Sequence, residues 1–206
     1  NLLISSNLNV AGNVGIGTTS PAYKLDVNAG NIRVGAHTFG SGSAANSGSL
    51  AIGKGANALY TGSSENTAVG INALASNLDK GPNDAFGADA MKFSTEATYN
   101  IAMGQGAGYR SQGTQNTFIG QYTGPYYSNL TGGYNTMIGI LSGLFMSGSA
   151  QRNTAIGQQS LYSMTDAANN TSVGSSTGYN LTTGNSNTFI GRSAGGGITT
   201  GNNNTI

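Results

Sequence analysis

Two acidic residues in this chain are spaced so that their carboxylates could act together. Asp79 and Glu96 are 17 residues apart, and this spacing matches the period of an internal repeat. On adjacent rungs of a coil the two carboxylates would lie about 5 Å apart. That separation suits the acid pair of a retaining glycosidase or a cation site. Gly62 and Gly113 occupy the flanking rungs, so the column is short. We interpret the two acids as solvated, with no catalytic residue and no bound metal.

Tyrosine is the second residue type that could carry a function. The chain has 10 tyrosines and no tryptophan, and one turn-rich segment holds Tyr122, Tyr126, Tyr127 and Tyr134. A tyrosine ring offers an apolar face and a hydroxyl, which suits a glycan or a protein surface, and loops on a rigid scaffold often carry recognition. We take these four residues as candidate ligand contacts. The alternative is that their rings pack against neighbouring rungs or across an oligomer.

Other motifs indicate no chemistry. Residues 48–55 approach a phosphate-binding loop, but Gly55 stands where the Ser or Thr after Lys54 would hold magnesium, and no helix is predicted to follow. The single histidine, His37, precedes a stretch rich in Gly and Ser and is interpreted as solvated. The absence of cysteine excludes disulfides and thiolate sites. The sequence therefore predicts neither an enzyme nor a cofactor.

The elements that position these residues come from a repeated phrase, Asn-Thr-x-Ile-Gly. Strong copies begin at Asn66, Asn100, Asn116, Asn135, Asn153, Asn170 and Asn187, and weaker copies include those that end at Gly35, Gly53 and Gly87. A short fixed period is typical of solenoids. Each repeat is interpreted as two short strands and two turns, which together form one rung of a parallel β-coil. Stacked asparagines and stacked threonines are predicted to hydrogen-bond from rung to rung.

Alternation along a strand predicts which side chains of the phrase share a face. The second and fourth residues point one way and the third points the other way. The fourth residue is always apolar, so we expect it to line the interior. This predicted core column is Ile52, Val69, Phe86, Met103, Ile119, Ile138, Ile156, Val173 and Ile190. The third residue is expected to form an exposed apolar column that a partner would cover, as at Ala68, Ala102, Phe118, Met137, Ala155 and Phe189.

Composition narrows the partners. Glycine accounts for 34 of the 206 residues, charged residues for only 7%, and the net charge is +1. No basic patch indicates binding to nucleic acid. No apolar run approaches the roughly 20 residues of a membrane helix, so no membrane insertion is predicted. The chain ends within a repeat at residues 204–206, and we interpret it as part of a longer protein.

The extended phrase Asn-Thr-x-Ile-Gly-x-x-Ala-Gly resembles the rungs of the YadA-like head of trimeric autotransporter adhesins, and similar rungs occur in phage tail fibres. The resemblance covers residues 49–206, although the rungs here are longer than the usual ones of that family. It implies a left-handed parallel β-roll with three chains side by side. Residues 12–21 and 24–27 resemble a module of trimeric tail fibres. We therefore expect an N-terminal β module at 1–35 and a β-roll of about ten rungs at 36–206.

These observations predict an all-β protein with a structural and adhesive function. We expect a homotrimer, because a coil with so short a rung encloses a thin core. The segment would belong to an extracellular fibre, on a cell surface or a virion, that contacts a cell-surface receptor, with glycan preferred over protein. One alternative is a polysaccharide-degrading tailspike enzyme, which would have longer rungs and clustered acids. Another is an ice-binding solenoid with a flat threonine face, which is disfavoured because the threonines share that face with the isoleucines that we expect to be buried.

Overall fold

The computed structural model describes residues 11–16, 19–21, 25–27, 32–34, 37–40, 49–59, 65–78 and 81–206. Within these residues the chain forms strands and turns and no helix. The strands are β1 (Val14–Ile16), β2 (Leu25–Val27), β3 (Ile32–Val34), β4 (His37–Gly40), β5 (Leu50–Ile52), β6 (Thr67–Val69), β7 (Asp84–Phe86), β8 (Ile101–Met103), β9 (Thr117–Ile119), β10 (Thr136–Ile138), β11 (Thr154–Ile156), β12 (Thr171–Val173) and β13 (Thr188–Ile190).

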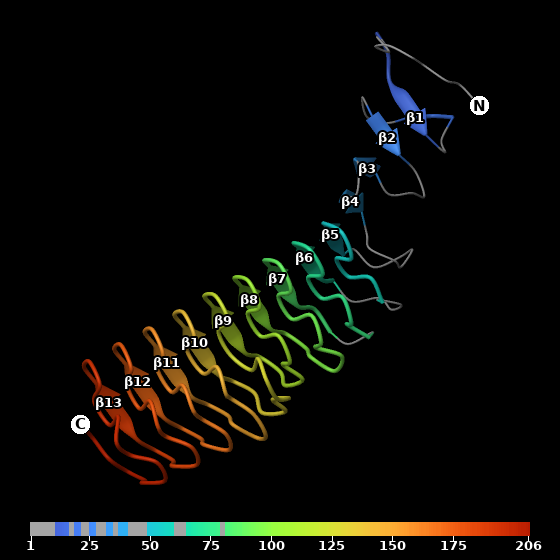
Figure 1. The fold of residues 1–206 in the computed structure, drawn as a ribbon. Coiled ribbons are helices and arrows are strands. Elements are labelled where there is room, and N and C mark those ends of the chain that lie inside the picture. The colour runs from blue at the N-terminus through green and yellow to red at the C-terminus, as the bar shows by residue number, and fades with distance from the viewer. Residues whose placement is uncertain are drawn as a thin grey trace.

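Strands β5 to β13 stack in sequence order as one parallel sheet, which forms one side of a β-solenoid (Figure 1). The pairing keeps equivalent residues of the phrase opposite each other, as with Thr136 and Thr154. The predicted parallel β-solenoid with rungs of about 17 residues is confirmed, and it makes about eight turns. Each rung adds one strand of three residues, and the return limbs are joined by isolated parallel bridges such as that between Gln151 and Ala168.

The chain before β5 is arranged differently. Strands β1 and β2 pair in parallel as a separate sheet. Strand β3 pairs antiparallel with β4, and β4 pairs antiparallel with β5. The weak copy of the phrase that ends at Gly35 is therefore not a parallel rung, and the parallel coil begins at β5. The division of the chain at residue 35 stays a prediction.

The third residue of the phrase, not the fourth, fills the interior. The third-position side chains are at most 2% exposed, and they are Ala51, Ala68, Ala85, Ala102, Phe118, Met137, Ala155, Ser172 and Phe189. The fourth-position residues are half-buried or exposed, up to 65% at Ile190. The predicted core column is therefore wrong for all nine of its residues: Ile52, Val69, Phe86, Met103, Ile119, Ile138, Ile156, Val173 and Ile190. Together with the second-position residues they form what we call the outer sheet face.

The limited room inside the coil explains why the third residue of the phrase is buried and the fourth is not. The residue four places after each closing glycine also lies inside the coil, and in seven of the nine rungs from β5 to β13 its size compensates for that of the third residue. In the other two rungs both residues are small, and a Cβ at Gly108 or Gly178 would meet large side chains of the neighbouring rungs. Leu161, which is fully buried, shares a rung with Ala155. By contrast, Gly124 shares a rung with Phe118, and a Cβ at Gly124 would overlap the Phe118 ring. Since protein interiors are close-packed, a large side chain at both positions of one rung would not fit.

This size compensation predicts a rescue. Phe118→Ala is expected to destabilise the chain by about 3–5 kcal/mol, because it opens a cavity. Adding Gly124→Leu should recover part of that loss, since Leu161 occupies the equivalent position beside Ala155 with a φ of 47°. Urea unfolding of both variants measures the recovery. Gly124→Leu alone, next to an intact Phe118, should destabilise. A double variant no more stable than Phe118→Ala would contradict the model of the core.

A buried column of asparagines runs along the inside of the coil. From Asn66 on, each asparagine Oδ1 accepts from the backbone N–H of the next asparagine, and in most rungs it also accepts from the Nδ2–H of that residue. For Asn135 and Asn153 these distances are 3.1 and 3.0 Å. The Nδ2 of Asn135 also donates across the coil to the carbonyl of Ala150, at 2.9 Å. The predicted asparagine ladder is confirmed, and it ties strand to return limb as well as rung to rung.

The closing glycines are required by the stacking itself. Their φ values lie between 117° and 139°, a region that side chains rarely adopt. A Cβ on Gly157 would overlap the carbonyl of Gly174 in the next rung. The turn that ends each strand is therefore possible only with glycine.

Candidate functional site

Aromatic rings from successive rungs form a continuous ladder on one side of the coil. Neighbouring ring centroids are 4.7–5.2 Å apart. The aromatic ladder consists of Phe93, Tyr109, Tyr126, Tyr127, Phe145, Tyr162 and Tyr179. Each ring lies five to seven residues after a closing glycine, so the period of the coil brings all of them to the same place. This regular offset is the signal that sequence reasoning missed.

Three pairs of rings in the aromatic ladder stack face to face. Tyr109 and Tyr126 stack at 4.7 Å, Tyr127 and Phe145 at 4.9 Å, and Tyr162 and Tyr179 at 4.7 Å. Aromatic pairs of this kind stabilise the fold by about 0.5–1.5 kcal/mol each beyond their buried area. The alternative interpretation of the tyrosines, that they pack from rung to rung, therefore holds for these pairs.

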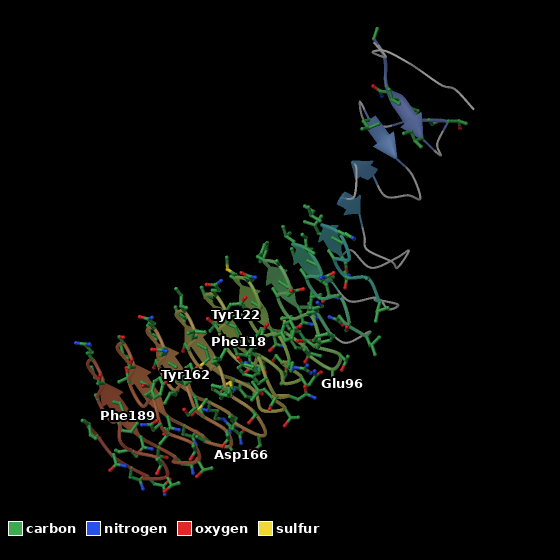
Figure 2. All side chains as sticks on the ribbon, in the orientation of Figure 1. Glu96, Phe118, Tyr122, Tyr162, Asp166 and Phe189 are labelled. Atoms are coloured by element: carbon green, nitrogen blue, oxygen red, sulfur yellow. The ribbon has the colours of Figure 1, made fainter. Side chains whose placement is uncertain are left out.

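A pocket of about 220 Å³ lies beside the aromatic ladder, between the rungs of β9 and β10. Tyr122, Tyr126, Tyr127, Leu141 and Leu144 line it. The rings of Tyr122 and Tyr126 meet edge to face at 5.0 Å, and those of Tyr126 and Tyr127 do so at 5.2 Å. Figure 2 shows Tyr122 beside the rung that carries the core residue Phe118. We call this hollow the tyrosine pocket.

Two of the pocket residues occupy an unusual backbone position. Tyr122 and Leu141 each lie two residues after a closing glycine, with φ values of 52° and 60°. Other rungs place small or polar residues there: Asn72, Asp89, Gly106, Gln159, Ser176 and Ser193. A positive φ costs a large side chain about 1–2 kcal/mol. The two apolar side chains at this position thus coincide with the pocket.

The structure brings together three of the four predicted ligand contacts and separates the fourth. Tyr122, Tyr126 and Tyr127 line the tyrosine pocket. Tyr134 lies on another corner of the coil, just before Asn135 of the buried asparagine column. The centre of its ring is 5.5 Å from the guanidinium of Arg152. Sequence reasoning also missed Leu141 and Leu144, which belong to the next rung and meet the tyrosines only through stacking.

The residues that line the tyrosine pocket are uncharged. Burial, and then the neighbouring Tyr109, raises the pKa of the Tyr126 hydroxyl above its ordinary value, so this group stays neutral at physiological pH. The cations Lys92 and Arg110 lie outside the lining, 5.5 and 5.1 Å from the centre of the Phe93 ring, and Arg110 is also 5.8 Å from the centre of the Tyr109 ring that stacks on Tyr126. Lys92 donates a hydrogen bond to Asp89, which raises the pKa of Lys92, and the two groups form an ion pair at 3.1 Å.

The acidic residues do not converge in the part of the chain that is described. Asp79 lies outside the described residues, so the predicted stacking of Asp79 on Glu96 is not tested. Glu96 and Asp166 are exposed and lie on rungs far apart, at the edge of the coil away from the strands (Figure 2). Asp166 accepts a hydrogen bond from the backbone N–H of Ser149 at 2.9 Å. The described residues contain no group of three or more His, Asp or Glu side chains that could hold a metal ion.

Comparison with known proteins does not name a family. No family model, no curated protein and no solved structure matches this chain. Across the described ranges there is also no helix with the length and hydropathy needed to span a bilayer. The functional assignment therefore rests on the geometry of the coil, its outer sheet face and its tyrosine pocket.

Proposed function

We propose that this chain is a segment of a homotrimeric extracellular fibre, built from parallel left-handed coils, that contacts a receptor on a cell surface. One observation carries the proposal: the outer sheet face is apolar and uncovered along β5 to β13. Met103 is 45% exposed on it and Ile156 is 39% exposed, and other exposed members are Leu50, Phe86, Ile101 and Ile190. A contiguous apolar surface of this kind marks a protein interface.

The charge of the outer sheet face supports association between copies of the chain. Among its residues in β5 to β13, Asp84 alone carries a charge. Threonines and β-branched apolar residues make up most of the rest, and a three-fold arrangement would bury them against each other. The partner is therefore the same chain, and the surface that pairs is the fourth-residue column, not the third-residue column that the sequence suggested.

The trimer predicts a mass and a mutational pattern. Light scattering coupled to size exclusion should give three times the 20.7 kDa mass of one chain. Ile156→Asp is expected to dissociate the assembly, because it buries a charge at the centre of the apolar face. Gln158→Asp is the matched control, since Gln158 is exposed two residues away, beyond the strand. A wild-type chain that is monomeric and stable would contradict the trimer.

The tyrosine pocket is the proposed point of contact with the receptor, for which we propose a surface glycan. Three copies in a trimer would strengthen weak individual sites through multivalency. Changing Tyr122, Tyr126 and Tyr127 together to alanine is expected to abolish binding to target cells or glycan arrays. Tyr134→Ala is the control, since that ring lies on a different corner and should leave binding unchanged. Retained binding by the triple variant would place the receptor site elsewhere in the fibre.

An ice-binding role is a second candidate, and the exposed face favours it more than the sequence did. Thr67, Thr117, Thr136, Thr154 and Thr188 are half-buried and share the outer sheet face with isoleucines and valines that are not in the core. A regular threonine face on a flat sheet could order water. Inhibition of ice recrystallisation by the monomer would support this role. A trimer that buries the same face would exclude it.

We propose no enzymatic activity. The exposed carboxylates of Glu96 and Asp166 lie outside the tyrosine pocket and on rungs far apart, so these two residues do not form the carboxylate pair of a glycosidase. Release of reducing ends from a bacterial polysaccharide by the wild-type chain, lost in Glu96→Gln, would replace the fibre proposal with the tailspike enzyme.

A further inference from the structure

The tyrosine pocket has the shape and chemistry of an aromatic cage. We propose that it binds a quaternary ammonium group, such as the trimethylammonium head of a choline substituent on a cell-surface glycan. The inference deepens the proposed adhesive function and rests on it only for the location of the ligand. The chemistry of the pocket can be tested separately.

The arrangement of the rings is the first argument. The pairs Tyr122–Tyr126 and Tyr126–Tyr127 meet at interplanar angles of 79° and 82°, so the walls of the pocket have nearly perpendicular orientations. One face of Tyr126 stacks on Tyr109 and one face of Tyr127 stacks on Phe145, which holds both rings in place from outside. Ring faces are electron-rich and attract a cation within about 6 Å of the ring centre.

The size of the pocket favours a head group over a whole sugar ring. Pockets for drug-sized ligands usually measure about 300–1,000 Å³, and this one measures about 220 Å³. A sugar that stacks on an aromatic ring needs a flat, open face, and one face of Tyr126 and one face of Tyr127 are already covered by Tyr109 and Phe145. A compact, roughly spherical group with several aromatic walls fits the pocket better.

The absence of charge in the lining selects among cations. Of the described residues that line the pocket, none is acidic or basic, and the pKa of Tyr126 is raised, so that hydroxyl carries no negative charge. Sodium or a lysine ammonium binds water strongly, and neutral walls with Leu141 and Leu144 could not replace that water. A trimethylammonium group spreads its charge over methyl groups and loses little hydration. The pocket therefore suits methylated ammonium over simple cations.

The backbone supports a dedicated site. Two residues after the closing glycine, Tyr122 and Leu141 are the two large apolar side chains among the rungs β5 to β13. Leu74, Met91 and Leu161 also have a positive φ, but they lie four residues after the glycine and are buried in the core. Both line the pocket. Packing alone does not require them there, since rungs with Ser176 or Ser193 at this position stack equally well.

The test is a titration of the full chain with choline, phosphocholine and 3,3-dimethylbutanol, which has the shape of choline without the charge. Tyrosine ring signals in NMR report binding. We expect choline to bind at least about tenfold more tightly than the neutral alcohol, and Tyr122→Leu to weaken choline binding by about tenfold. Tyr126→Phe should retain most of the affinity, because the ring face remains. Tyr99→Leu, at an exposed ring on another corner, should change nothing.

Three results would overturn the inference. Equal binding of choline and the neutral alcohol would make the pocket merely apolar. A Tyr126→Leu variant that melts at the wild-type temperature gives the loss of binding caused by removal of the ring. If Tyr126→Phe lost as much binding, recognition would depend on the hydroxyl, as for a sugar. Attachment to phosphatidylcholine vesicles without binding to phosphocholine on a soluble carrier would indicate a membrane surface instead of a glycan substituent.

The cell-binding experiment separates this inference from the proposed function. If the triple tyrosine variant loses cell binding but choline neither binds nor competes, the adhesive function stands and the cage is wrong. If choline binds in the pocket and cell binding survives the triple change, the cage is right and the adhesive role of this pocket is wrong.

Discussion

Ala155→Asp is expected to be severely destabilising, and Ile156→Asp is expected to leave the rungs folded. Ala155 is fully buried and shares its rung with the equally buried Leu161. An aspartate there would place an unpaired charge in the interior and exceed the available volume, at a cost of several kcal/mol. Ile156 points outward on the outer sheet face, so a charge at that position remains accessible to water in a single chain.

The comparison is made by circular dichroism during thermal or urea unfolding of both variants. Because each rung contacts mainly its neighbours, amide hydrogen exchange should show that the damage from Ala155→Asp centres on β10 to β12. Ile156→Asp should lose oligomer mass while keeping the β spectrum. Equal loss of folding in the two variants would mean that the interior and exterior faces of β11 are not as described.

Asn135→Ala is expected to be the second most damaging change. The substitution leaves the backbone N–H and the side-chain amide of Asn153 without their acceptor and removes the donor to the Ala150 carbonyl. At about 1–3 kcal/mol for each buried group left unsatisfied, the loss should be about 3–5 kcal/mol. Hydrogen exchange should increase first in the rungs on either side of β10.

Asn129→Ala is the matched control for this prediction. Asn129 is exposed on a turn, and the hydrogen bond described for it is one that its backbone carbonyl accepts from the N–H of Gly148. The variant should unfold within about 0.5 kcal/mol of the wild type, as surface substitutions usually do. Similar losses for the two asparagines would show that the buried ladder does not hold the rungs together.

The burial of the third residue of the phrase in place of the fourth connects these predictions to the proposed function. If Ile156 were in the core, the exposed column would consist mainly of small side chains such as Ala68 and Ala85. With the third residue buried, the exposed column carries Ile156, Met103 and Phe86, which form a far larger apolar surface. The thin interior and the apolar exterior are thus consequences of one choice of face.

Much of the architecture could be predicted from the sequence because it depends on spacing. The period of the closing glycines predicts the parallel coil and the stacking of Asn135 on Asn153, and these hold because identical residues meet identical residues in each turn. The tyrosines of residues 122–127 were also predicted to form a candidate site. The contacts of these tyrosines with Leu141 and Leu144 could not be predicted, since a contact between two rungs depends on which way each turn directs its side chains.

The sequence by itself determined the repeat, the position of one of the two strands predicted in each rung, and the asparagine ladder. All of these follow from one local rule applied in every turn of the coil. The tertiary structure alone decided which face of the strand is inside. Because side chains alternate along a strand, Ala155 and Ile156 lie on opposite faces, but alternation does not determine which face meets the return limb. Hydrophobicity alone favours burial of Ile156, which the structure does not show. Interior volume makes the choice, because Leu161 leaves room beside it for alanine and none for isoleucine.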